Sequence, residues 1–136
     1  MDDCRRALRG DAGGEVAAVV DWELCTLGDP LADVGLLMVY WPDSGEEATS
    51  LGQPANLAPG FPGRDELRQR YAERSGRDLS ELDFYVAFGY WKLAIILEGV
   101  YARYAAGQYG KVDPGIRHFA TVVENLAEAA AEAEAG

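Results

Sequence analysis

The order of apolar and polar positions predicts a short N-terminal β-hairpin followed by helices. Residues 15 to 22, "EVAAVVDW", form a short apolar run directly after "GDAGG". This pattern is typical of a strand that is entered from a tight turn. The preceding "CRRALR" would be the partner strand. Because a two-stranded ribbon is marginal in water, the hairpin is expected to pack on helices.

The segment from 28 to 41, "GDPLADVGLLMVYW", has the pattern of a helix start. Asp29 can accept backbone N–H groups as the N-cap, and Pro30 at the first helical position has no N–H to leave unpaired. Asp33 falls in the first turn, where the helix dipole favours an acid. Residues 34 to 41 are apolar on almost every face, so this helix is expected to be buried nearly all round.

Three further helices are predicted after an irregular Pro- and Gly-rich stretch that covers residues 42 to 63. Residues 64 to 76, "RDELRQRYAERSG", predict a short, mostly solvated helix that Gly76 terminates. Ser80 and Asp83 have the spacing of a capping box, which would open a long central helix through about residue 106.

Aromatic residues recur at helical spacing along this central helix, and such residues are usually part of a core. The last helix is predicted from "DPGIRHF", with Asp113 as cap, Pro114 at its first position and an apolar stripe behind them. The stripe consists of Ile116, Phe119, Val123 and Leu126. The final "AEAAAEAEAG" is expected to fray.

Composition and charge exclude several classes of partner. With 136 residues and 49% hydrophobic content, the chain is expected to form one domain or a piece of one. A net charge of -11 argues against nucleic acid. The longest apolar run is too short to span a bilayer, so no membrane partner is expected. Two cysteines without CxxC spacing, and no apolar leader, predict a cytoplasmic protein.

One stretch of the chain resembles a known enzyme family. Residues 19 to 33, "VVDWELCTLGDPLAD", resemble aminoglycoside-phosphotransferase-type kinases, in which a strand ends in a DF- or DW-type motif that GDP and Asp follow. The later "YWKLAIILEGVYARYAAGQYG" is similar to kinase-like domains fused to acyl-CoA dehydrogenases. The resemblance runs from about residue 14 to residue 125.

The resemblance implies a mostly α (α+β) fold, equivalent to the C-lobe of a protein-kinase-like fold. A short N-terminal β-hairpin would pack on about four helices. Residues 1–136 would form a partial phosphotransferase C-terminal lobe. Within it, residues 1–22 would form the hairpin and the metal-binding strand, and residues 23–136 the helical subdomain.

The resemblance also implies a metal site at the end of the strand. Asp21 would hold the Mg²⁺ that bridges the phosphates of ATP. Glu23 would be a second metal ligand, or would accept a hydrogen bond from a group that itself binds the metal. Asp3 would stand where the family has a metal-binding Asn. Hard oxygen ligands of this kind suit Mg²⁺. The alternative for Asp21 is a carboxylate paired with a backbone N–H or an Arg.

The sequence contains no HGD-type catalytic loop and no phosphate-covering loop, so no catalytic residue is identified. We therefore expect a C-terminal part of an ATP-dependent phosphotransferase for a small-molecule hydroxyl, such as a hydroxyacyl-CoA or a sugar-like alcohol. Alone, it is expected to be inactive and to bind neither Mg²⁺ nor ATP tightly. The alternative is a non-catalytic helical remnant or interaction module, which would self-associate or pair with an N-lobe.

Three isolated polar residues on the later helices have two interpretations. The resemblance implies that Glu98 lies on the acceptor side, over which the substrate would bind. A pair of Glu98 with an Arg such as Arg103 is the simpler expectation, and Lys92 is expected to extend its charge to water. His118 is the only histidine. It has no suitably spaced second ligand and is expected at the surface.

Overall fold

The computed structural model describes residues 18, 20, 27–43, 46, 55–108 and 116–135 of the chain. Within these residues the protein is mostly helical, as predicted. The elements are α2 (Pro30–Val39), the 3₁₀ helix η2 (Ala55–Leu57), α3 (Arg64–Ser75), α4 (Leu82–Ala105) and α5 (Ile116–Ala135). Ala18 and Val20 belong to no strand. The rest of the predicted hairpin lies outside the described residues, so the hairpin is not shown.

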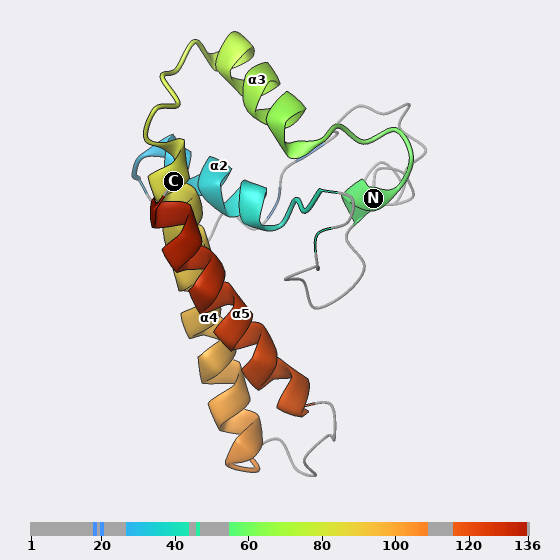
Figure 1. Ribbon diagram of the computed structural model, residues 1–136, viewed down its shortest axis with the longest axis vertical. Coiled ribbons are helices and arrows are strands. Elements are labelled where there is room, and N and C mark those ends of the chain that lie inside the picture. Colours follow the sequence, from blue (N-terminus) through green and yellow to red (C-terminus); the bar gives the residue numbers. More distant parts are fainter. Residues whose placement is uncertain are drawn as a thin grey trace.

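The 24-residue helix α4 is the central element. Figure 1 shows α5 running back along α4, so that the end of α5 lies near the start of α4. Helix α2 packs against the first half of α4, and α3 lies at that end of the molecule. The site described below is therefore built around the end of α4 that meets α2.

Two groups of buried side chains hold these helices together. In the first, Val39 of α2 meets residues of α4 and α5, and in the second, Val34 and Met38 of α2 meet Leu82 at the start of α4. The α4 and α5 members of the first group are Leu93, Ala94, Leu97, Val122 and Leu126. Both groups include α2, so this short helix joins the parts of the core.

Helix α2 is less enclosed than its apolar sequence predicts. Leu31, Val34, Met38 and Val39 are buried, but the Leu37 side chain is 42% exposed and that of Tyr40 is 49% exposed. The prediction of burial nearly all round was therefore wrong. Helix α2 packs on α4 with one face, so only the residues on that face are covered.

The predicted capping box at the start of α4 is also absent. Ser80 donates from its backbone N–H and its hydroxyl to the Asp78 carboxylate, both at 3.0 Å. These two hydrogen bonds hold the pKa of Asp78 below its ordinary value. Asp83 instead forms an ion pair with Arg68 of α3 at 3.0 Å. The helix begins at Leu82, two residues after Ser80, and its N-cap residue Glu81 makes no side-chain capping hydrogen bond.

Three large aromatic residues of α4 lie outside the core, which corrects the sequence prediction for them, whereas Tyr90 packs against the core. The exposed fractions are 59% for Phe84, 42% for Phe88 and 54% for Trp91. Smaller residues face the neighbouring helices instead. They are Leu82, Ala87, Gly89, Leu93, Ala94 and Leu97.

The two remaining helices follow their predictions except at the C-terminal end of α5. Helix α3 has no fully buried residue and ends at Gly76, which has a φ of 66° in the left-handed region. On α5, Val122 and Leu126 are buried and Phe119 and Val123 pack beside them. The tail does not fray, because α5 continues through Ala135. The predicted cap at Asp113 and Pro114 lies outside the described residues.

Candidate functional site

The predicted metal ligands Asp3, Asp21 and Glu23 lie outside the described residues. The structure describes the segment that follows them, which leads through Leu27 and Gly28 into α2. Among the residues that it does describe, no group of three His, Cys, Asp or Glu side chains could hold a metal ion. The Gly28-Asp29-Pro30 turn is therefore the described part of the candidate site.

Asp29 is the N-cap of α2, as the sequence predicts. Its Oδ1 atom accepts the Leu31 N–H at 2.9 Å, and its backbone carbonyl accepts the Ala32 N–H at 3.1 Å. Pro30 occupies the first helical position and Asp33 the first turn, where its carboxylate is exposed. These contacts fix the chain direction at the point where the motif residues 19 to 33 enter the helix.

Tyr85 of α4 joins this cap to the central helix. Partial burial raises the pKa of the Tyr85 phenol, and a hydrogen bond to Asp29 and the negative charges of Asp29 and Glu81 raise it further. The phenol therefore stays protonated and donates to Asp29 while the carboxylate also accepts from the backbone. The sequence did not identify Tyr85 as a candidate site residue. Nothing in its spacing distinguishes it from the other tyrosines.

A second polar cluster lies where α2 ends and α3 begins. The Trp41 indole N–H donates to the Pro62 carbonyl at 2.9 Å, and its ring meets Phe61 edge-on at 5.9 Å. Asp43 Oδ1 accepts the Arg64 N–H at 2.9 Å. Asp43 therefore caps α3 from 21 residues away, because the N-cap residue Gly63 has no side chain for this purpose.

Arg64 is the centre of that cluster. Its guanidinium donates to both oxygens of Glu46, at 3.1 and 2.8 Å, and its Nε to the Trp41 carbonyl at 3.2 Å. Burial raises the pKa of the nearby Tyr90 phenol, an effect that Arg64 opposes and Glu46 reinforces. The two-pronged contact fits a guanidinium to a carboxylate and joins the start of α3 to Glu46. Its role is structural.

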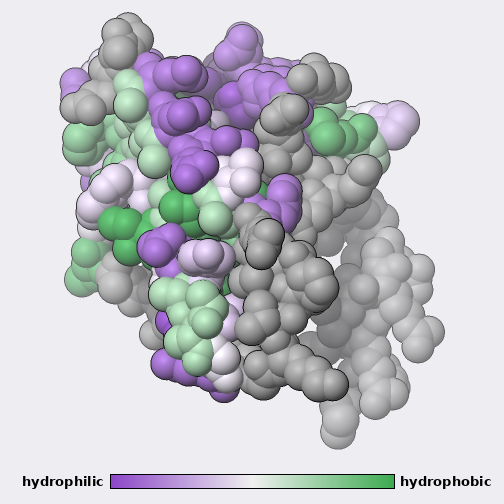
Figure 2. Space-filling model, turned by 60° about the horizontal axis from the view of Figure 1, so that its bottom comes forward, coloured by the Kyte–Doolittle hydropathy of each residue, from purple (hydrophilic) through white to green (hydrophobic). Residues whose placement is uncertain are grey.

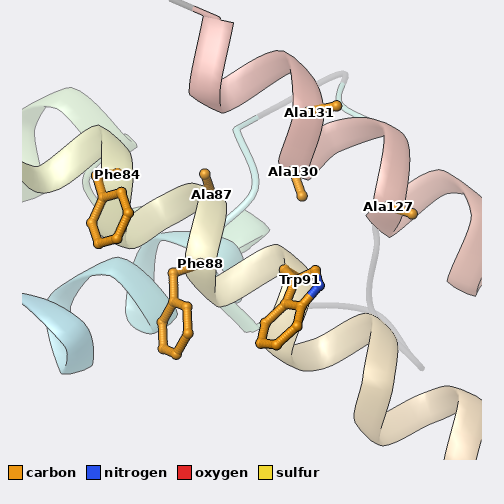
Figure 3. A pocket seen from close by; sticks show the side chains of 7 residues that line it. All are labelled: Phe84, Ala87, Phe88, Trp91, Ala127, Ala130 and Ala131. Carbon is orange, nitrogen blue, oxygen red and sulfur yellow. The ribbon is translucent and has the colours of Figure 1, made fainter.

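An open apolar groove runs between α4 and α5, with a volume of about 490 Å³. Figure 3 shows Phe84, Phe88 and Trp91 projecting from one side of α4, with alanines of α5 along the other wall. The Phe88 and Trp91 rings stack at 5.9 Å. A second groove of about 440 Å³ lies on α3 beside Arg70 and Arg74. Figure 2 shows one face of the molecule, where hydrophobic residues reach the surface among hydrophilic ones.

The remaining residues considered from the sequence lie at the surface. Lys92, Glu98 and His118 are all exposed, as predicted for Lys92 and His118. Three ion pairs occur in the described ranges, and none of them joins Glu98 to Arg103. The expected Glu98–Arg103 pair was therefore wrong, because an exposed Glu98 needs no partner to offset burial.

Comparison with known proteins decides the family. The sequence profile described as "Phosphotransferase enzyme family" matches residues 8–85, which include the DWE and GDP motifs. The chain belongs to this phosphotransferase family. The resemblance deduced from "VVDWELCTLGDPLAD" is thereby confirmed.

Similar curated proteins support the narrower resemblance of this phosphotransferase-family chain. Over 117 residues it is 36% identical to acyl-CoA dehydrogenase family member 11 of Pongo abelii, which covers 83% of the chain. It is 39% identical over 97 residues to family member 10 of Mus musculus, and 32% over 98 residues to the probable acyl-CoA dehydrogenase IBR3 of Arabidopsis thaliana. These matches cover 69% and 68% of the chain.

The matched relatives are much longer than this chain. The aligned region spans only 15%, 9% and 12% of these three proteins. No solved structure matches. None of the described helices is sufficiently long and apolar to cross a membrane.

Proposed function

We propose that this chain forms the C-terminal, helical part of an ATP-dependent phosphotransferase that acts on the hydroxyl group of a small molecule. The observation that carries the proposal is the family match over residues 8–85, which contains the DWE and GDP motifs in the expected order. The Asp29 cap supports it, because it holds the second motif rigidly on α2 and α4. A rigid support is what a metal-binding strand end needs from its surroundings.

In this proposal Asp21 is the metal-binding carboxylate, with Glu23 and Asp3 as further oxygen donors. When bound, Mg²⁺ would neutralise charge on the nucleotide phosphates. The role of the described helices is to orient this segment. The Tyr85 phenol and the backbone N–H of Leu31 both bond to Asp29, so the turn that follows the metal segment has a defined position.

The acceptor is proposed to be a metabolite hydroxyl, such as that of a hydroxyacyl-CoA. The similar proteins are named as acyl-CoA dehydrogenases, which supports this class of acceptor over an antibiotic. The 136 residues contain no HGD-type sequence to supply a catalytic base. Phosphoryl transfer depends on positioning and charge stabilisation, so we expect no ATP turnover by this chain without a complementing chain.

The test measures binding of the Mn·ATP complex to the protein. Binding is detected as an enhancement of the water-proton relaxation rate, which rises when this paramagnetic complex binds a protein. Mn²⁺ takes the same oxygen ligands as Mg²⁺. We expect weak binding, of the order of millimolar, which Asp21→Asn reduces at least about tenfold because one anionic ligand is lost. Asp65→Asn is the matched control, since Asp65 is an exposed acid in the first turn of α3 and lies outside the motif.

Equal binding by Asp21→Asn and the unchanged chain would remove the metal role from Asp21. No binding by either would count against the proposed nucleotide site. Formation of ADP, followed by ³¹P NMR, tests the expected inactivity separately. Turnover that depends on Asp21 would show that the chain needs no complementing part.

A further inference from the structure

Helix α3 is the basic segment of an acidic chain. Residues 64–77 contain five of the 12 Lys and Arg residues but only three of the 23 Asp and Glu residues. The whole chain carries a net charge of -11 and therefore repels anions in general. Among the described helices, only α3 has more basic than acidic residues. An anionic ligand is thus attracted to α3 rather than to the other helices.

The groove on α3 has an apolar floor and a cationic side. Its described lining consists of Leu67, Arg70, Tyr71, Arg74 and Ser75. Leu67 and Tyr71 are partly buried and pack against the second group of core residues, so they form the floor. Arg70 and Arg74 are exposed and lie one helical turn apart, on the same side of α3. Two guanidinium groups therefore stand together beside an apolar surface.

These two arginines have more positive charge than their described neighbours offset. The three ion pairs in the described ranges engage three other arginines or Arg70, and none of them includes Arg74. Arg70 pairs with Glu66 through its Nη2 atom alone, which leaves its other N–H groups for a further acceptor. Like charges four residues apart on a helix repel each other. An anion held between Arg70 and Arg74 would remove that repulsion.

We propose that the groove on α3 binds a small phosphate monoester, with the phosphate between Arg70 and Arg74 and the organic group over Leu67 and Tyr71. A guanidinium can donate to two phosphate oxygens at once, which favours phosphate as the anion. The groove volume of about 440 Å³ falls within the roughly 300–1,000 Å³ of small-molecule sites, and its apolar floor gives an organic group contact area. The proposal is independent of phosphotransfer.

Titration with phenyl phosphate, followed by the backbone amide signals in NMR, gives the first test. The buffer contains EDTA, so that no divalent metal ion takes part. We expect saturable shifts that are largest in α3, with a Kd of the order of millimolar. Inorganic phosphate should bind about threefold or more weakly, because it lacks the ring that contacts the floor. Phenol should not bind measurably, because it lacks the charge.

Substitution of one arginine separates the groove from the general charge of the segment. Arg74→Gln should raise the Kd for phenyl phosphate about fivefold or more, because a charged hydrogen-bond donor is lost. The matched control is Arg77→Gln. Arg77 is also exposed and close in sequence, but it follows Gly76 at the end of α3 and does not line the groove. At about 0.15 M salt it should change the Kd less than about twofold.

Removal of one acid gives a test in which affinity rises. Glu66→Gln should lower the Kd about twofold or more, because Arg70 loses its competing acceptor. A gain of this kind does not result from damage to the fold. Asp65→Asn is the matched control, because Asp65 is likewise exposed in the first turn of α3. It lies about 100° further round the helix from Arg70 than Glu66 does, and should leave the Kd nearly unchanged.

The outcomes decide the proposal separately from the proposed nucleotide site, because no metal ion or ATP is present. A lack of saturable binding of phenyl phosphate up to about 20 mM would overturn it. Equal affinity for phenyl phosphate and inorganic phosphate would rule out an ester as the ligand. Equal losses in Arg74→Gln and Arg77→Gln would mean attraction to the basic segment without a site in the groove. If Glu66→Gln and Asp65→Asn behave alike, Arg70 does not hold the phosphate.

Discussion

Gly35 of α2 lies directly against the backbone of Tyr85 in α4. A Cβ atom at Gly35 would stand 2.5 Å from both the carbonyl carbon and the carbonyl oxygen of Tyr85. Real Cβ atoms do not approach backbone atoms so closely, so only glycine permits this crossing of the two helices. The same crossing brings the Tyr85 phenol to Asp29 at the start of α2. Close packing at Gly35 thus positions the candidate site.

Substituting Gly35 by alanine should therefore destabilise the protein, although alanine is the better helix former. The added methyl group must push α2 and α4 apart, which costs about 1–3 kcal/mol in overpacked sites. Thermal unfolding followed by circular dichroism should show a melting temperature several degrees lower. Gly89→Ala should cost less, because its nearest neighbour is the Val39 side chain at 3.0 Å.

Gly99→Ala is the matched control for this prediction. Gly99 also lies inside α4, but the nearest atom to its added Cβ would be an Arg103 nitrogen at 3.7 Å, which is an ordinary contact. Here the helix propensity of alanine should dominate and stabilise the protein by about 0.5–1 kcal/mol. Equal effects of Gly35→Ala and Gly99→Ala would contradict the close crossing.

The raised pKa of Tyr85 predicts a loss of stability at alkaline pH. The folded protein holds the phenol proton more tightly than the unfolded chain, in which the ordinary pKa is 10.0. Its contribution to stability is thus complete below pH 10.0 and declines as the pH rises through the higher pKa of the folded state. Phenolate absorbance measures the pKa of Tyr85, and urea unfolding at several alkaline pH values measures the free energy of unfolding.

Two variants separate the causes of this shift. Asp29→Asn keeps an oxygen for the Leu31 N–H but removes the negative charge, so the pKa of Tyr85 should fall towards its ordinary value. Tyr85→Phe should remove the share of the alkaline destabilisation that comes from Tyr85. The pKa of Tyr90 is also raised, chiefly by burial, so a smaller pH dependence should persist. An unchanged titration in Asp29→Asn would mean that Asp29 does not face the phenol.

Local signals predicted the described helices well because their causes are local. Asp29 and Pro30 are adjacent in sequence to the amide groups that they affect, and Gly76 ends α3 through its own φ angle. Caps formed from a distance left no such signal. Asp43 caps α3 across a 21-residue separation. Ser80 was misassigned for a different reason, because the Asp78 carboxylate two residues earlier accepts its backbone N–H.

The faces of α4 were not predictable from its own residues. Apolar side chains surround the helix, so their spacing does not tell which face meets α2 and α5. The structure settles this by placing Gly89 and Leu93 inside and Trp91 outside. The candidate site was predictable only in part for the same reason. Asp29 was predicted as a helix cap, but its contact with Tyr85 could not be predicted, because it arises from the crossing of α2 and α4 at Gly35.

The capping of α3 by Asp43 yields a further prediction. In Asp43→Ala the Arg64 N–H loses its acceptor, and loss of an N-cap of this kind costs about 0.5–2 kcal/mol. The effect should concentrate in the first turn of α3, because the C-terminal end is held separately at Gly76. Hydrogen exchange resolved by peptide should therefore show faster exchange at the start of α3 than at its end.

Asp43→Asn is the control, since its amide oxygen can still accept the Arg64 N–H while the charge is removed. It should retain most of the protection that Asp43→Ala loses, and its melting temperature should lie closer to that of the unchanged chain. If both variants open the first turn of α3 equally, the negative charge of Asp43 at the N-terminus of α3, rather than the capping bond, holds the start of this helix. The distinction follows because the two variants differ in the acceptor atom but share the loss of charge.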